Sequence, residues 1–262
     1  DREVADAYLL CVRNQKEQVY RPCLFKTAAH VRFKGSVHEY VAVPVDVVPD
    51  TIFFTWGTSA QGRTKTAARF MQDRDCLLAS YARNPTDGHT LFFLGQTYSC
   101  LNDHHNAYKY YVLALPAASG DENKFETLYR LGLEVEELLK TDPVYTWALA
   151  RDYHLKAYNM RPKRPEPLVR LAGYYIKQKQ HALAYIFARH ACELPLPMGE
   201  LNFVQRHVYE FDRYAALSTC AWAAQEYKAG LWAAELALAA CPDVDYLYEH
   251  RAFYQEKLGV KK

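Results

Sequence analysis

Two adjacent side chains near the start of the sequence, His38 and Glu39, belong to residue types that often carry out chemistry. They follow a strand-like run in RFKGSVHEYVAV, residues 32–43. A neutral imidazole is a common metal ligand, and a carboxylate can act as a general base. Adjacent residues of an extended strand point to opposite faces, so we expect the two side chains to act separately and not as one ligand pair.

Two other clusters of polar residues are weaker candidates. Asp73, Arg74 and Asp75 form a D-x-D pattern. The surrounding sequence has the apolar period of a helix, whereas a metal-binding D-x-D pattern needs a loop or a strand end at which both carboxylates converge on one ion. We therefore interpret this cluster as part of a solvated helix face, and the adjacent His104 and His105 as polar residues of a turn.

The composition excludes several classes of protein. The chain has 32 basic and 30 acidic residues, so its net charge of +2 gives no general attraction to nucleic acid. No window approaches the run of about 18 to 20 apolar residues that crosses a bilayer. The seven cysteines are odd in number and form no C-x-x-C pair, which indicates neither a disulfide framework nor a zinc site. We expect a cytoplasmic protein with reduced thiols, no nucleic-acid partner and no membrane span.

The predicted secondary structure changes along the chain from strands to helices. Up to about residue 57, runs rich in Val, Tyr and Phe predict strands over 7–14, 19–26, 30–43 and 51–56. From about Thr64 onward Ala, Leu, Tyr and Lys dominate, and apolar residues recur every three or four positions, which predicts helices. Small and polar residues join the two parts, as in a linker or a surface loop.

The helical part repeats itself with the spacing of the tetratricopeptide motif, whose unit is about 34 residues. In the first unit the motif positions are Leu94, Gly95, Tyr98, Ala107, Tyr111 and Ala114. Small residues allow two antiparallel helices to approach closely, and the tyrosines fill the groove between neighbouring pairs.

Further units follow in the same frame. The second contains Leu131 and Gly132 and is stretched by several residues, and the third contains Leu171 and Ala172 at the same positions. A looser fourth unit begins at about Phe203, and the last segment predicts a capping helix. The expected fold class is mainly α: a tetratricopeptide-like α-solenoid of helical hairpins, preceded by a small β segment.

The combination of the two parts resembles a known family. Residues 19–43, VYRPCLFKTAAHVRFKGSVHEYVAV, resemble the end of the catalytic domain of family 2 glycosyltransferases of the GT-A type. The later runs TIFFTWG, LFFLGQTY and HRAFYQEKLG follow the order found in members that carry C-terminal tetratricopeptide repeats. The resemblance implies that residues 1–62 are the C-terminal β segment of a GT-A-like domain and that residues 63–262 are the repeat domain with its capping helix.

The resemblance also implies an inverting transfer of a hexosyl group from a nucleotide-sugar donor, with Mn²⁺ or Mg²⁺ as a cofactor of the complete enzyme only. His38 would be a metal ligand, Arg21 would bind the donor's phosphate, and Glu39 would be the catalytic residue that positions the acceptor, or would simply cap a loop. Fewer than about 60 residues cannot form a nucleotide-binding domain. We therefore expect this chain alone to be incomplete and inactive.

The inner helices of the repeats are expected to line a groove for a peptide, protein or glycan acceptor. On the repeat frame the candidate substrate-binding residues of this groove are His89, Gln96, Arg170 and Lys177. A homodimer is a further expectation. The alternative is a non-catalytic tetratricopeptide module for protein interaction, in which the groove docks a peptide and the β segment is an N-terminal cap.

Overall fold

The computed structural model describes residues 5–13, 18–49, 52–55, 66–197 and 203–260. Its contacts divide the chain into a first unit, residues 1–153 with 199–204, and a second unit, residues 154–198 with 205–262, and we describe each by itself. Within the described ranges, no helix has both the length and the apolar character needed to cross a membrane. The expected domain boundary between residues 62 and 63 lies outside the described residues and stays a prediction.

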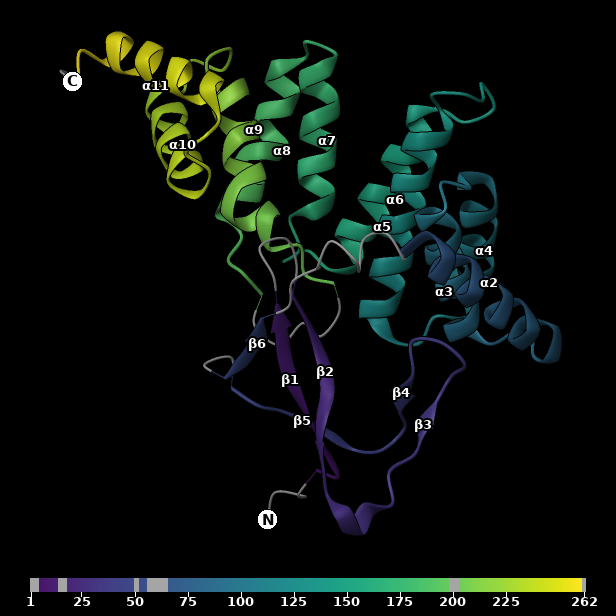
Figure 1. Ribbon diagram of the computed structural model, residues 1–262. Coiled ribbons are helices and arrows are strands. Elements are labelled where there is room, and N and C mark those ends of the chain that lie inside the picture. The colour runs from purple at the N-terminus through teal and green to yellow at the C-terminus, as the bar shows by residue number, and fades with distance from the viewer. Residues whose placement is uncertain (1–4, 14–17, 50–51, 56–65, 198–202, 261–262) are drawn as a thin grey trace. The chain divides into compact units, whose positions relative to one another are not determined.

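A four-stranded sheet in the first unit is built around β1 (Ala7–Arg13), as Figure 1 shows. β2 (Gln18–Phe25) pairs antiparallel with β1, with a register shift at Tyr8 and Leu9. β5 (Val45–Val47) and β6 (Phe53–Thr55) pair parallel with the first and the last residues of β1. The Val-, Tyr- and Phe-rich runs therefore form strands as predicted.

The predicted strand over 30–43 is broken in the structure. After the short helix η1 (Thr27–Ala29), β3 (Phe33–Lys34) and β4 (Tyr40–Val41) form a separate two-stranded hairpin. Its tip, residues 35–39, is a bend in which Gly35 has φ +98° and His38 has φ +54°. Because both angles are left-handed, the chain turns here, and the expectation that His38 lies on an extended strand is wrong.

The sheet has a small core of its own. Leu9, Cys11 and Tyr20 form a buried cluster. In contrast, Leu24 is 52% exposed and Phe54 is 56% exposed. The sheet therefore leaves much of its apolar side-chain surface in contact with solvent.

The first helices after the sheet are α2 (Thr66–Arg83), α3 (Gly88–Cys100) and α4 (His104–Ala117). They enclose a cluster of buried side chains, Leu77, Leu91, Leu94, Tyr110 and Ala114. The D-x-D pattern lies inside α2, as predicted. The two adjacent histidines lie in the first turn of α4 and not in a turn before it, because the preceding Asp103 caps the helix by accepting a hydrogen bond from the Asn106 N–H.

Close packing of α3 on α4 depends on one glycine. A Cβ atom added to Gly95 would lie 2.7 Å from Cδ1 of Tyr111, a distance too short for any side chain. Tyr111 and Ala107 are fully buried and pack on Leu131 of α5 (Gly120–Leu138). The motif positions expected from the repeat therefore have the packing roles that the spacing predicts.

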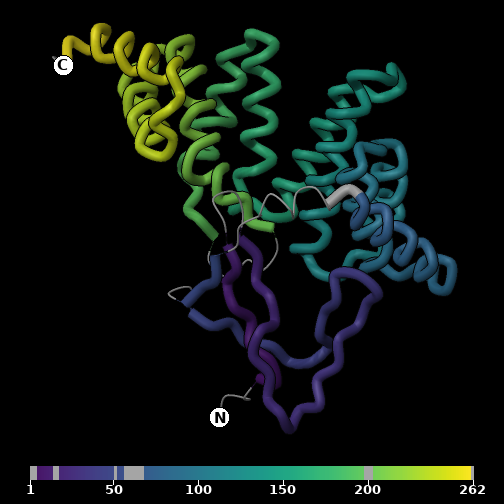
Figure 2. Tube along the Cα trace, in the orientation of Figure 1, coloured from purple at the N-terminus to yellow at the C-terminus, as the bar shows by residue number. Residues whose placement is uncertain are grey.

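α6 (Trp147–Met160) contains the division between the units, and five helices lie in the second unit (Figure 2). They are α7 (Glu166–Lys177), α8 (His181–Glu193), α9 (Arg213–Cys220), α10 (Tyr227–Ala240) and α11 (Asp245–Leu258). One π-helical turn, η2 (Val208–Asp212), leads into α9. This π-helical turn was not predicted from the sequence.

Small residues also fill the core of the second unit. Ala172, Ala184 and Ala188 are fully buried in one cluster with Tyr254. A Cβ added to Gly230 would lie 2.2 Å from Cζ of Tyr254, so α10 and α11 approach as closely as α3 and α4 do. The helices are those of a tetratricopeptide-like α-solenoid preceded by a small β segment, as predicted.

Candidate ligand-binding surfaces

The hairpin tip of the first unit lies against α3. The ring of His38 stacks on the ring of Phe93, with centroids 4.1 Å apart and planes 9° apart. Nε2 of His89 lies 3.0 Å from the carbonyl oxygen of His38, which accepts its hydrogen bond. The ring of Tyr40 in β4 lies 4.8 Å from the ring of His89. The hairpin therefore contacts α3 through a ring face and a backbone carbonyl.

The shape of the tip fits this contact closely. A Cβ added to Gly35 would lie 3.2 Å from Cε1 of His89, and φ at Gly35 favours glycine. Val37 packs beside the buried cluster of α2, α3 and α4. Oγ of Ser36 is hydrogen-bonded to Oγ of Ser80 in α2, at 2.9 Å. The tip is thus anchored to two helices of the first unit.

The pKa of each histidine in this contact is lowered, which favours the neutral imidazole. Burial against the helix lowers the pKa of His38, and the charges of Arg21 and Arg69 act in the same direction, whereas Asp73 opposes them. Burial also lowers the pKa of His89. Neutral imidazoles suit the stacked ring and the single hydrogen bond seen here.

The structure brings together residues that the sequence assigned to two different sites. His38 and His89 are in contact, and Gln96 lies two turns after His89 on the same face of α3. Oε1 of Gln96 is buried and has no hydrogen-bond partner among the described residues. We call His89, Phe93 and Gln96 the α3 face. Phe93 was missed by the sequence analysis, although it lies between the two predicted residues.

The residues assigned by the glycosyltransferase resemblance do not form a metal site on their own. Glu39 is exposed next to the hairpin tip, and Arg21 is exposed on β2 opposite Leu10. In the part of the chain that the structure describes, no three His, Cys, Asp or Glu side chains converge as metal ligands. The described residues around His38 therefore do not fit a divalent cation unless further ligands come from elsewhere.

The other two predicted binding residues lie in the second unit. Arg170 and Lys177 are both exposed on α7 and are seven residues apart. Seven residues make two turns, so the two cations lie on one side of the helix, about 10 Å apart. This spacing suits a ligand with two separated negative charges.

Groups on the next helices complete this surface. Asp212, at the end of the π-helical turn, forms an ion pair of 3.2 Å with His207. Burial raises the pKa of Asp212 above its ordinary value, although the charges of His207 and Arg170 oppose that change. Burial and the charge of Asp212 raise the pKa of Tyr246 in α11, whose side chain is 43% exposed.

We call Arg170, Lys177, Asp212 and Tyr246 the α7 face. α9, which follows Asp212, contacts both α7 and α11, so these residues come from neighbouring elements of the second unit. Asp212 and Tyr246 were missed by the sequence analysis. Two shallow hollows, of about 530 Å³ along α11 and about 360 Å³ beside η1, include no residue of either face.

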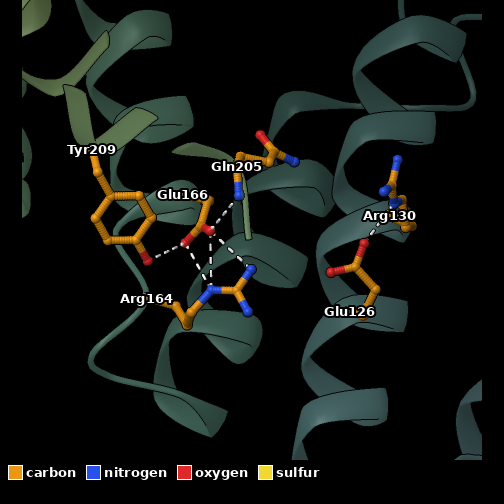
Figure 3. A network of polar contacts seen from close by, with 6 residues as sticks. All are labelled: Glu126, Arg130, Arg164, Glu166, Gln205 and Tyr209. Carbon is orange, nitrogen blue, oxygen red and sulfur yellow. Dashed lines mark hydrogen bonds and ion pairs between the residues drawn. The ribbon is translucent and has the colours of Figure 1, made fainter. Parts of the chain in front are cut away.

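A buried ion pair supports the start of α7 (Figure 3). Nη2 of Arg164 lies 2.8 Å from Oε1 of Glu166, and both side chains are almost completely buried. The hydroxyl of Tyr209 donates to the same carboxylate at 3.3 Å, and the backbone N–H of Gln205 lies 3.5 Å from it. Because the carboxylate is fully enclosed, we interpret this group as a structural support and not as a binding site.

The first unit has a similar ion pair on α5. Nε of Arg130 donates to Oε1 of Glu126 at 2.8 Å, as Figure 3 shows. The Glu126 side chain is only 3% exposed. We interpret this pair, like the one in the second unit, as a structural support and not as a binding site.

The comparisons with known proteins concern the fold. No family model and no curated protein matches the chain. The chain is similar to the crystal structure of MamA, with 14% identity and a TM-score of 0.50, over 71% of this chain and 96% of that one. It is also similar to the Cut9-Hcn1 hetero-tetramer of APC/C, with 14% identity and a TM-score of 0.51, over 74% of this chain and 34% of that one.

A third similar structure is a tetratricopeptide repeat protein from Parabacteroides merdae, with 15% identity and a TM-score of 0.49, over 78% of this chain and 75% of that one. At these identities the likeness concerns the fold alone, which is a tetratricopeptide-like α-solenoid. The glycosyltransferase resemblance gains no support from the comparisons.

Proposed function

We propose that this chain is a protein-interaction module whose second unit binds an extended acidic segment of a partner at the α7 face. The observation that carries the proposal is the exposed pair of cations, Arg170 and Lys177, two turns apart on one helix. Repeat proteins of stacked helical hairpins use the first helices of their pairs as binding surfaces. The fold therefore supports a binding role for this helix.

The spacing of the cations suggests the form of the ligand. A segment in the extended polyproline II conformation has three residues per turn and rises about 3.1 Å per residue, so acidic side chains three residues apart lie on one side, about 9 Å apart. That distance is close to the separation of two residues seven positions apart in a helix, about 10 Å. Arginine binds a carboxylate through two parallel hydrogen bonds, and the half-exposed ring of Tyr246 offers an apolar surface with a polar end.

The test is a binding measurement with a defined probe. A fluorescently labelled peptide with two glutamates three residues apart is titrated with the intact chain, and a peptide with lysines at the same positions serves as the probe control. We expect only the acidic peptide to bind, and the double variant Arg170→Ala with Lys177→Ala to weaken it at least about tenfold. Lys228→Ala, at an exposed lysine on α10, is the matched control and should bind normally. Equal binding of both peptides, or no loss in the double variant, would contradict the proposal.

A second candidate function is the sugar transfer implied by the sequence resemblance. The observation that favours it is the open sheet, in which Phe53 is 39% exposed and Phe54 is 56% exposed. Such a surface is typical of a sheet that another layer covers. In that case a nucleotide sugar and a divalent metal would be bound mainly by residues outside this chain, with His38 as one ligand, Arg21 at the phosphate and Glu39 near a peptide or glycan acceptor.

Calorimetry with Mn²⁺ and a panel of UDP- and GDP-sugars tests this candidate. If the chain binds any donor in a metal-dependent manner, and His38→Ala loses that binding, the result favours sugar transfer over the interaction module as the function. We expect no binding by the chain alone, because its described residues do not bring three metal-ligating side chains together.

A further inference from the structure

In the first repeat, the hairpin tip covers a position of the first helix that is exposed in the third repeat. Phe93 directly precedes the Leu94–Gly95 pair of its repeat, and Arg170 directly precedes the equivalent Leu171–Ala172 pair. The two residues therefore have the same place on the first helix of their repeats. Phe93 is covered by the ring of His38, whereas Arg170 is exposed.

The contacts of the tip are those of a bound peptide. It offers a backbone carbonyl to His89, a flat ring to Phe93 and a small apolar side chain, Val37, to the buried cluster behind α3. Peptide-binding surfaces commonly combine such backbone hydrogen bonds with pockets for single side chains. Beside these contacts, the buried Oε1 of Gln96 lacks a hydrogen-bond partner among the described residues.

Although it is anchored to two helices, the tip makes few contacts: two hydrogen bonds, one ring stack and the packing of Val37. Gly35, Ser36, His38 and Glu39 all remain exposed, and only Val37 is half-buried. His38 also adopts a left-handed backbone conformation, which is unfavourable for a residue with a side chain. A segment held by so few contacts can be displaced by a competitor that makes the same ones.

We propose that the α3 face is a second peptide-binding site, which the hairpin tip occupies as an internal ligand until a partner's turn segment displaces it. The partner segment would present a planar side chain to Phe93 and an adjacent carbonyl to His89, as the hairpin does. Because its residues lie in the first unit, this site is independent of the acidic-segment site on α7, and either can fail without the other.

The test uses an engineered disulfide, which we call the lock, to tie the hairpin tip to α2. Ser36 and Ser80 have oxygens 2.9 Å apart, so the double variant Ser36→Cys with Ser80→Cys brings two thiols within reach of a disulfide. The probe is a labelled peptide with the sequence of residues 33–41, closed into a ring to hold its turn. Peptide mapping by mass spectrometry identifies the disulfide, since Cys23, Cys76 and Cys100 are also exposed.

We expect the probe to bind weakly to the unmodified chain, because the tethered tip competes at an effective concentration in the millimolar range. Val37→Asp combined with His38→Ala should release the tip and strengthen probe binding at least about tenfold. The oxidised lock should abolish binding, and reduction should restore it. Ser36→Cys alone, treated with the same oxidant, is the control.

Two results would overturn the proposal. One is equal binding of the probe to the oxidised lock and to its reduced form. The other is no binding to the released variant, which circular dichroism must show to be folded. As a check on the site, Phe93→Ala in the released variant should remove the gained binding.

Discussion

The helices α3 and α7 are each the first helix of their repeat, but they differ in the side chains that they present and in whether these are covered. On α3 the residue before the Leu-small pair is Phe93, and it is covered by the hairpin tip. On α7 the same place is held by Arg170, which is exposed. The packing behind both helices is alike, because Gly95 and Ala172 are both buried against the second helix of the pair. The repeat thus determines where the two surfaces lie, and single side chains at its outer positions make one of them apolar and covered and the other cationic and exposed.

The largest expected effect follows from removing the buried ion pair that supports the start of α7. Glu166→Ala deletes the buried carboxylate that binds Arg164 and the hydroxyl of Tyr209. We expect the free energy of unfolding to fall by about 3 to 5 kcal/mol, as is usual when one partner of a buried ion pair is lost. Urea denaturation measures this change.

The matched control is Glu193→Ala in the exposed pair with Arg189 on α8. It should cost at most about 1 kcal/mol, because exposed ion pairs contribute little. Equal losses in the two variants would mean that the buried pair does not support α7.

The next largest effect concerns the small residue that follows each leucine. Gly95→Ala places a Cβ 2.7 Å from the ring of Tyr111 and should lower the free energy of unfolding by about 1 to 3 kcal/mol through overpacking. The equivalent place on α7 already holds Ala172. Gly173→Ala next to it meets no atom within 4 Å and should stabilise the chain by about 0.5 to 1 kcal/mol. Thermal unfolding of both variants, compared at one pH, decides whether the signs differ as expected.

A smaller effect separates the covered residue from the exposed one. Phe93→Ala removes the ring under His38 and should cost at least about 1 kcal/mol. Arg170→Ala changes an exposed side chain and should alter stability by no more than about 0.5 kcal/mol. If chemical denaturation gave both variants the same stability, the claim that only one of the two faces is covered would lose its basis.

The smallest effect is a pH dependence in the second unit. Burial lowers the pKa of His250 below its ordinary value of 6.5, although Glu249 opposes the change, and Nδ1 lies 3.0 Å from Oγ of Ser218. The folded chain therefore binds fewer protons at this site than the unfolded chain does. This contribution to stability is present above about pH 6.5 and is lost as the pH falls.

His250→Asn keeps a polar partner for Ser218 but cannot titrate in this range. The decrease in the urea midpoint between pH values of about 7.5 and 5.5 should be smaller in this variant than in the unmodified chain. An unchanged decrease would assign the pH dependence to other groups.

The sequence was sufficient to predict the packed helices, but not all the residues that form the α3 face and the α7 face. The spacing of Leu94, Gly95 and Tyr111 predicts two packed helices because packing depends on periodic small and large residues within about 30 positions. Residues 30–43 were predicted as one strand-like run despite the turn-prone Gly35 within it, because the surrounding Val, Phe and Tyr all favour a strand. The contact of His38 with Phe93 joins segments more than 50 residues apart, and no local pattern reports such a contact.

The same limit applies to the second unit. Arg170 and Lys177 were predicted as binding residues because the repeat frame assigns both to the inner helix of their unit. Asp212 was missed, since its position depends on the π-helical turn over Val208–Asp212, for which the sequence has no signal. Tyr246 was missed because it lies on the capping helix, outside the units whose frame could be aligned.

The contrast between the covered α3 face and the exposed α7 face is tested by measuring the binding of both peptides to the chain that carries the disulfide. With the tip oxidised onto α2 through residues 36 and 80, the acidic peptide and the cyclic hairpin peptide are titrated separately by fluorescence anisotropy. If α3 is covered and α7 is exposed, the lock abolishes binding of the hairpin peptide and leaves the affinity for the acidic peptide unchanged. If the lock instead leaves the hairpin peptide bound, or weakens the acidic peptide equally, the two faces do not differ in the way proposed here.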